Sequence, residues 1–163
     1  MNRAVHAMAL AKIYHPSPSD GTADDYEAAI LQRIKVTHGD PVRLAETIRA
    51  GFPVDTVEQL AGELKIPSRR LMQLLALSPA TMGRRKLKKK PLTPQESDRL
   101  YRIVSVFATA IRLFEGDIDA AREWLQRPAR GLGNLIPLEQ LDTEPGSEAV
   151  VDLIGRIEHG VAN

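Results

Sequence analysis

Residues 116–160 read GDIDAAREWLQRPARGLGNLIPLEQLDTEPGSEAVVDLIGRIEHG, a close succession of signals that start and stop helices. Gly116 ends one helix, and Asp117 is placed to N-cap the next, which stops before the following proline. Thr143 is placed to cap the last helix, with Pro145 in its first turn. The spacing of these signals predicts a packed helical module in the last quarter of the chain.

Apolar residues recur at helical spacing inside this module. The stripes are Ile118, Ala121, Trp124 and Leu125 on one helix, and Val150, Val151, Ile154 and Ile157 on the last. We interpret Trp124 as a core anchor, because it lies on the apolar face. Between the stripes, Gly131 and Gly133 form a turn that favours residues tolerant of positive φ. Pro137 then starts a short helix, and Gly160 closes the final one.

A run of predicted helices precedes this module. Their start signals are Thr22 with Asp25, Asp40 with Pro41, Asp55, Pro67 with Ser68, and Ser78 with Pro79. The strongest start is Thr93-Pro94-Gln95-Glu96, because Thr93 can bond the N3 amide while Glu96 reaches back. We expect the helix that follows to act as a spine, with an apolar stripe of Leu100, Ile103, Val104, Phe107, Ile111 and Phe114. No segment shows sustained period-two alternation, which predicts an all-α fold.

Charge is unevenly distributed, although the net charge is only +1. Between Glu63 and Glu96 there is no acidic residue, but there are nine basic ones: Lys65, Arg69, Arg70, Arg84, Arg85, Lys86, Lys88, Lys89 and Lys90. From Glu115 onward, ten acidic residues stand against four arginines. This asymmetry indicates one half that faces a polyanion and another half with a different partner.

Short turns join the predicted helices over residues 55–65, 68–76 and 79–87, which is typical of a helix-turn-helix motif. Two placements of this motif along the chain, which we call registers, are compatible with the sequence. In the first, residues 57–75 form the motif, and the groove-facing residues are Ser68, Arg69, Arg70 and Gln73. In the second, residues 71–86 form it, and the groove-facing residues are Ser78, Thr81, Arg84 and Arg85. We favour the second register because its face is more basic and carries arginine, the usual reader of guanine.

A run of lysines follows this second motif. In the DNA-binding interpretation these side chains lie along phosphates: Lys86, Lys88, Lys89 and Lys90. The alternative is a solvated charged loop, which is the usual role of such runs. Serine-proline helix starts beside arginine-rich helices favour DNA binding.

Catalytic, metal-dependent and membrane functions find little support in the sequence. The chain has no cysteine, which excludes disulfides and thiolate chemistry and fits a cytoplasmic protein. Its histidines show no ligand spacing: His6, His15, His38 and His159. No apolar run approaches the length of a membrane span. We therefore expect no catalytic residue, no metal, no cofactor and no membrane partner.

Four pieces of the chain resemble the Xre/MbcA/ParS antitoxin family, the partners of RES-domain toxins. They are LALSPATMGRRK, LTPQESDRLYRI, AAREWLQRP and GLGNLIPLEQLDTEPGSEAVVDLIGRIEHGV. The resemblance extends over residues 57–161, and the order and spacing of the pieces make it specific. It implies an Xre-type helix-turn-helix domain that binds the operon's own promoter DNA, usually as a homodimer. It also implies a C-terminal module that clamps a RES toxin, an enzyme that degrades NAD.

The resemblance further implies that the chain's terminal residues enter the toxin's active-site cleft. Trp124 and Leu141 are expected to support the module rather than touch the toxin. Asn134 stands where the family commonly has a glycine, and asparagine also tolerates positive φ. The residues carried over as toxin-binding are Leu132, Gly133, Pro137, Thr143, Arg156, Glu158, His159, Gly160, Val161, Ala162 and Asn163.

Four segments make up the predicted organisation. A flexible arm over residues 1–21 precedes a helix-turn-helix DNA-binding and dimerisation domain over residues 22–92. A connecting helix over residues 93–115 leads to a toxin-binding domain over residues 116–163. The alternative function is a stand-alone helix-turn-helix transcriptional regulator with a C-terminal protein-interaction module.

Overall fold

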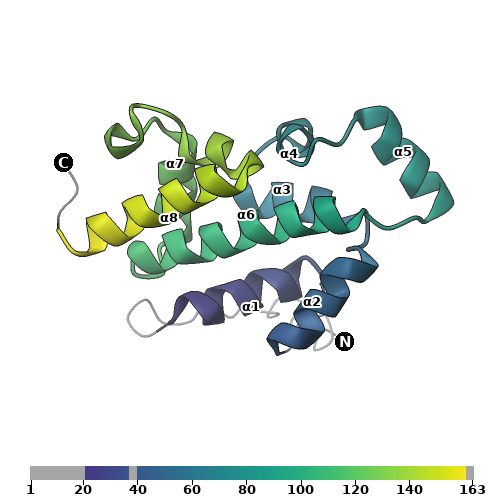
Figure 1. Ribbon diagram of the computed structural model, residues 1–163, viewed down its shortest axis with the longest axis horizontal. Helices are drawn as coiled ribbons and strands as arrows, with labels where there is room; N and C mark the ends of the chain where they lie inside the picture. Colours follow the sequence, from purple (N-terminus) through teal and green to yellow (C-terminus); the bar gives the residue numbers. More distant parts are fainter. Residues whose placement is uncertain (1–20, 37–39, 161–163) are drawn as a thin grey trace, which may run out of the picture.

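Helices account for the regular structure of the chain. The computed structural model describes residues 21–36 and 40–160, and within these ranges it contains no strand, only an isolated bridge between Ala129 and Leu135. In order, the elements are α1 (Ala23–Arg33), α2 (Pro41–Ala50), α3 (Thr56–Leu64), α4 (Ser68–Leu74), α5 (Pro79–Lys88), α6 (Pro94–Leu113), α7 (Ile118–Gln126), the 3-10 helices η1 (Arg130–Leu132) and η2 (Pro137–Asp142), and α8 (Glu144–Glu158) (Figure 1). The predicted all-α fold is confirmed. The predicted N-terminal arm lies outside the described residues except for Gly21.

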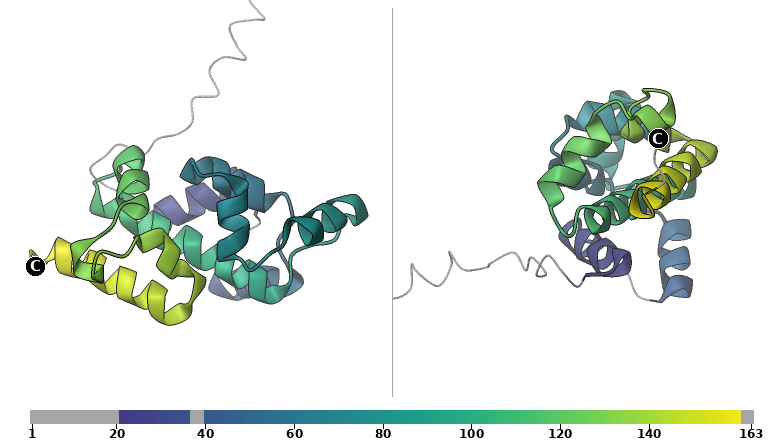
Figure 2. Two further views of the ribbon diagram at one scale, coloured as in Figure 1. Left: turned by 90° about the horizontal axis from the view of Figure 1, so that it is seen from above. Right: turned by 90° about the vertical axis from the view of Figure 1, so that its left-hand side faces the viewer.

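α6 is the central helix of the molecule. Its capping box is formed as predicted, with the Thr93 hydroxyl accepting from the Glu96 N–H at 3.2 Å and the Glu96 carboxylate accepting from the Thr93 N–H at 2.7 Å. α6 packs against α1 and α2 on one side and against α7, η2 and α8 on the other (Figures 1 and 2). It therefore forms part of the core of both halves, beyond the connecting role expected from the sequence.

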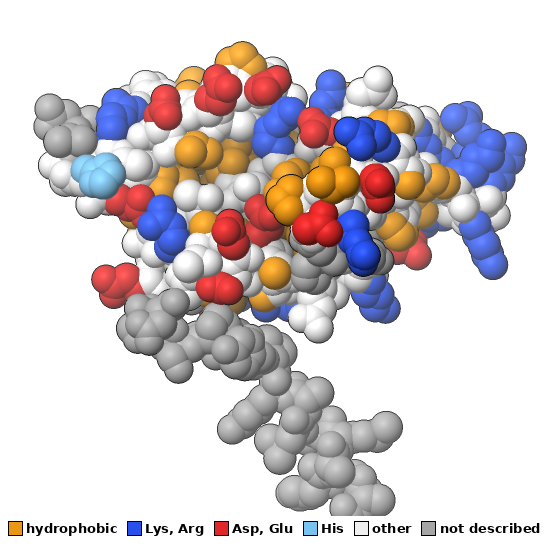
Figure 3. All heavy atoms as spheres, turned by 60° about the horizontal axis from the view of Figure 1, so that its bottom comes forward, with side chains coloured by type: hydrophobic (Ala, Val, Ile, Leu, Met, Phe, Trp, Pro, Cys, Tyr) orange, Lys and Arg blue, Asp and Glu red, His pale blue; other side chains and the backbone are white. Residues whose placement is uncertain are grey.

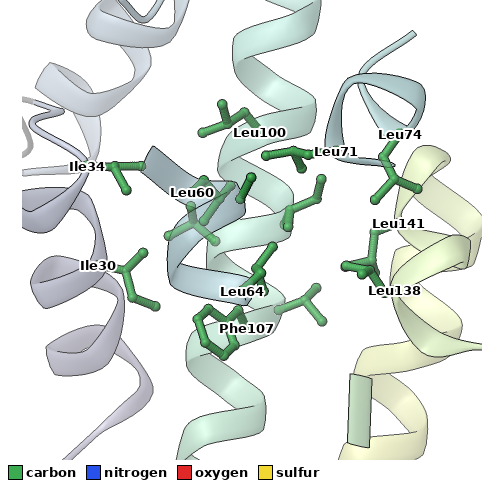
Figure 4. Close-up of a cluster of buried hydrophobic side chains, with 14 of the residues drawn as sticks. Ile30, Ile34, Leu60, Leu64, Leu71, Leu74, Leu100, Phe107, Leu138 and Leu141 are labelled. Atoms are coloured by element: carbon green, nitrogen blue, oxygen red, sulfur yellow. The ribbon is translucent and has the colours of Figure 1, made fainter. Parts of the chain in front are cut away.

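A single cluster of buried apolar side chains runs through both halves. Leu100 and Phe107 of α6 belong to it and are fully buried. Figure 4 shows the side chains that other elements add: Ile30 and Ile34 of α1, Leu60 and Leu64 of α3, Leu71 and Leu74 of α4, and Leu138 and Leu141 of η2. Trp124 packs against this cluster and lies 6.4 Å from the ring of Phe114, so its interpretation as a core anchor is confirmed.

Most helix starts follow the predicted capping chemistry. The side chains that accept a backbone N–H at an N-cap are Thr22, Asp40, Ser78, Thr93, Asp117 and Thr143. The prediction was wrong at Asp55, which adopts a helical conformation and makes no side-chain cap bond. Instead, the Thr56 hydroxyl donates to the Pro53 carbonyl at 2.6 Å. It was also wrong at Val151, which is 43% exposed although it was assigned to the buried stripe of α8.

The loop after α2 is joined to the loop before α6. Gly51 has φ +91°, and a Cβ there would lie 2.1 Å from the Leu92 carbonyl, so only glycine fits. Next to it, the Leu92 N–H donates to the Phe52 carbonyl at 2.9 Å. The Phe52 N–H donates to the buried hydroxyl of Ser97, also at 2.9 Å. These contacts fix the point at which the chain leaves α5 and enters α6.

The molecule is elongated along α6. α5 projects at one end, and the C-terminal end of α8 lies at the opposite end (Figures 1 and 2). α5 and the C-terminal end of the acidic module are therefore spatially separated.

Candidate functional site

α5 forms a basic projection at one end of the molecule. Figure 3 shows Lys and Arg side chains gathered at this end. Arg84 is exposed on α5, and Leu87 is 88% exposed. The exposed lysines that follow are Lys88, Lys89 and Lys90. Three of the four sequence-predicted phosphate contacts therefore share one accessible end of the chain.

The inner side of α5 is held by ion pairs to neighbouring helices. Met82 is buried, and Arg85 donates to the carboxylate of Glu96 in the α6 capping box. Lys86 pairs with Glu58 of α3. The expectation that Arg85 faces outward beside Arg84 was wrong, because its side chain is only 16% exposed and engaged by Glu96. Arg85 and Lys86 instead fix the direction of α5.

The environment of Glu96 explains why this pair remains ionised. Burial opposes ionisation of the carboxyl, but hydrogen bonds from Arg85 and Thr93 outweigh this effect. The net result is that the pKa of Glu96 lies below its usual range. One carboxylate thus caps α6 and anchors α5.

Two further DNA-binding candidates are engaged in capping. Ser78 accepts from the Thr81 N–H at 3.1 Å, and its hydroxyl donates to the Thr81 hydroxyl at 2.9 Å. Ser78 is exposed and Thr81 is half-buried. Their hydroxyls serve the start of α5 in this structure, at the end of the helix where a recognition helix meets base edges.

The first register places its arginines on α4. Arg69 is exposed there, whereas Arg70 pairs with Glu139 of η2 at 3.1 Å. Gln73 is exposed beside them. Arg70 thus already contacts the C-terminal module, while the outer face of α5 makes no such contact among the described residues. This arrangement favours the second register.

The C-terminal module is fastened to α3 by polar contacts. The Arg122 guanidinium donates to the Glu63 carbonyl at 2.6 Å, and the Gln126 amide donates to the Leu64 carbonyl at 3.1 Å. These side chains of α7 satisfy carbonyls at the C-terminal end of α3. Lys65 pairs with Asp119 at 2.7 Å, and this hydrogen bond lowers the pKa of Asp119. This junction could not be predicted from the sequence, because a pairing 54 or more residues apart leaves no local signal.

The toxin-binding candidates implied by the resemblance occupy different environments. Pro137 is buried at the start of η2, and its contact with a toxin stays a prediction. Thr143 is exposed and caps α8, and Leu132 is half-buried in η1. Glu158 pairs with Arg112 of α6 at 2.7 Å. The exposed candidates Gly133, Arg156, His159 and Gly160 remain accessible, whereas Val161, Ala162 and Asn163 lie outside the described residues.

The turn through η1 packs tightly against α8. A Cβ at Gly131 would lie 2.3 Å from the Leu153 side chain, so a larger residue there would displace this leucine. Gly133 and Asn134 both have positive φ, +66° and +64°. The expectation that Asn134 keeps the turn is thus confirmed. Arg156 of α8 donates to the Gly131 carbonyl at 3.3 Å and holds the turn in place.

The described residues hold no cluster of three or more His, Asp or Glu side chains with metal-ligating geometry. Nor does any helix among them have the length and apolar character needed to cross a membrane.

Comparison with known proteins identifies a domain family for each half of the chain. The family described as the antitoxin Xre/MbcA/ParS C-terminal toxin-binding domain matches residues 109–160. The antitoxin Xre-like helix-turn-helix domain matches residues 43–105. Antitoxin Xre of Yersinia enterocolitica is 34% identical over 150 residues, which cover 92% of this chain and 98% of the relative.

The chain belongs to the Xre/MbcA/ParS antitoxin family.

Other relatives differ in how much of the chain they match. Antitoxin Xre of Photorhabdus laumondii is 37% identical over 116 residues, covering 71% of this chain and 78% of the relative. A protein of Sphingobium named Prs ADP-ribosylating antitoxin is 23% identical over 128 residues, covering 74% of this chain and 80% of the relative. As a family member, the chain is an antitoxin of a toxin–antitoxin system, with a helix-turn-helix domain and a toxin as its partner.

The Glu96–Arg85 pair yields a pH-dependent prediction. Glu96→Gln keeps the size of the side chain and removes the charge that holds Arg85. Because the folded-state pKa of Glu96 is lowered, its contribution to stability is present above the unfolded pKa and lost as pH falls through the folded pKa. We expect Glu96→Gln to lower the free energy of unfolding by about 1–2 kcal/mol at pH 7 and by much less near about pH 3.

Urea unfolding of both proteins at the two pH values measures this difference. Glu123→Gln is the matched control, since Glu123 pairs with Arg127 on the surface, where the two side chains are 54% and 72% exposed. The control should change stability by less than about 0.5 kcal/mol. An equal loss for Glu96→Gln at both pH values would contradict the ion-pair account.

Proposed function

We propose that this antitoxin neutralises a RES-domain toxin that degrades NAD, by occluding its active site, and that it represses its own operon by binding promoter DNA. The observation that carries the proposal is the position of α5 and the C-terminal end of α8 at opposite ends of one continuous core (Figure 1). Two macromolecules can engage these ends without competing for the same surface.

α5 is the recognition helix in this proposal. Arg84 projects from its outer face and is suited to bidentate contact with guanine in the major groove. Lys88 and the two lysines after it contact phosphates. Arg85 and Lys86 act as positioning residues, because their ion pairs to Glu96 and Glu58 set the angle of α5.

DNA binding in this proposal uses a homodimer. Two copies related by a two-fold axis place two α5 helices on two half-sites of a palindromic operator. An operator as partner also locates the protein in the cytoplasm, with the operon that it regulates.

Electrostatics support the toxin-binding end. An enzyme that binds NAD needs basic groups to hold the dinucleotide's phosphates. The region from Glu115 onward has ten acidic residues and four arginines, and so complements such a cleft. In our proposal, the tail over residues 161–163 enters the cleft.

DNA binding is tested with fluorescence anisotropy on a promoter duplex at several salt concentrations. We expect Arg84→Ala to weaken binding about 5- to 150-fold, because it removes a base contact. Lys88→Ala should weaken binding to all sequences and reduce the salt slope by about 1. Arg69→Ala is the matched control on α4 and should bind nearly as well as the wild type.

If Arg69→Ala loses more affinity than Arg84→Ala, the first register is correct and α4 is the recognition helix. Absence of promoter binding by the wild-type protein would overturn the DNA-binding part of the proposal.

Toxin neutralisation is tested by co-expression with the product of the neighbouring gene, which the proposal takes to be a RES-domain protein, scoring growth and cellular NAD. The full chain should restore both. A chain ending at Gly160 should restore less, with an unchanged melting temperature, because the last buried residue of the described chain is Ile154. If the full chain fails to restore growth, the RES assignment is wrong; if the shortened chain restores it fully, the tail does not block the active site.

A further inference from the structure

A groove of about 810 Å³ lies between η1 and the second half of α8. Leu132 and Val151 contribute apolar side chains to it, and Gly155 lines it without a side chain. Polar groups that also line it are Asp152, Arg156 and His159. His159 directly precedes Gly160, so an occupant of the groove lies next to the point where the tail begins.

The groove is a stable feature of the fold. Gly131 of η1 lies against the side chain of Leu153 of α8, close enough that an added Cβ would displace this leucine. Arg156 ties the same turn to α8 through its bond to the Gly131 carbonyl. Both walls are therefore held in place before a partner arrives, which lowers the entropic cost of binding.

Apolar surface is left uncovered in this groove. Val151 is 43% exposed, although it follows the buried Val150 in the same helix. At Gly155, an added Cβ would meet nothing within 4 Å, so the space above this helix position is open. The groove therefore has room for an apolar side chain from outside.

A row of carboxylates runs along α8 beside the groove. Glu144, Glu148 and Asp152 follow one another at intervals of four residues and so share one face of the helix. All three are exposed, and none forms an ion pair within the described chain. By contrast, Glu139 and Glu158 of the same module are neutralised by Arg70 and Arg112. Three carboxylates without an ion pair to the described residues thus share this face of α8, and Asp152, the last of them, lines the groove.

From this juxtaposition we infer that the groove between η1 and α8 receives an apolar side chain of the toxin, flanked by Lys or Arg residues that pair with the carboxylate row. The inference rests on the proposed function and adds a docking surface to the active-site occlusion by the tail. The C-terminal domain match over residues 109–160 contains the whole groove, which makes the toxin the occupant. A toxin side chain bound in this groove lies next to Gly160, where the tail begins.

Gly155→Leu tests the inference, because the new side chain fills the groove from within the chain. The helix tolerates it, since leucine has a higher helix propensity than glycine and the Cβ meets open space. Gly62→Leu is the matched control: Gly62 lies in α3, and a Cβ there also meets nothing within 4 Å. We measure binding of each full-length variant to the purified RES-domain protein by calorimetry, with melting temperature as the check on folding.

We expect Gly155→Leu to weaken toxin binding about tenfold or more, whereas Gly62→Leu binds like the wild type. Glu148→Gln with Asp152→Asn should slow association at low salt and lose this effect at high salt. If both Gly155→Leu and the charge variant bind like the wild type, the groove is not the docking surface, while the proposed function stands. If the wild-type protein itself fails to bind the RES-domain protein, the proposed function fails and the groove inference fails with it.

Discussion

Burial of α6 is the constraint on which the rest of the structure depends. Leu100 and Phe107 are fully buried in a cluster that takes side chains from α1, α3, α4 and η2. Loss of a buried aromatic side chain of this kind costs about 3–5 kcal/mol, which is a large part of the stability of a domain of this size. Because the helix-turn-helix half and the toxin-binding half share this cluster, neither half packs fully without the other.

Polar contacts turn this shared core into a fixed arrangement. Arg122 and Gln126 of α7 satisfy carbonyls at the end of α3, and Arg70 of α4 pairs with Glu139 of η2. The basic and acidic halves are thus joined where their charges meet. Charges without an ion pair in the described part of the chain lie further out, among them Lys88 to Lys90 on one side and Glu144, Glu148 and Asp152 of α8 on the other.

Local signals were sufficient to predict the fold. Capping at Thr93, Asp117 and Thr143 depends on residues within three positions, so the helix starts were predicted correctly. The orientation and burial of individual side chains depended instead on contacts between elements distant in the sequence. Arg85 turns inward because Glu96 and its capping bond lie there, and Pro137 is buried because η2 packs against α6 and α7. Val151 is likewise exposed because of the way η1 packs against α8. The spacing of apolar residues does not predict this packing.

The central claim is that one rigid core presents a DNA-binding end and a toxin-binding end simultaneously. The most direct measurement is sedimentation velocity of the purified antitoxin mixed with a labelled promoter duplex and a separately labelled RES-domain protein. We expect a single boundary that carries both labels and sediments faster than the antitoxin–DNA or the antitoxin–toxin complex alone. Release of the duplex when the toxin is added, or separate boundaries for the two labels, would contradict it.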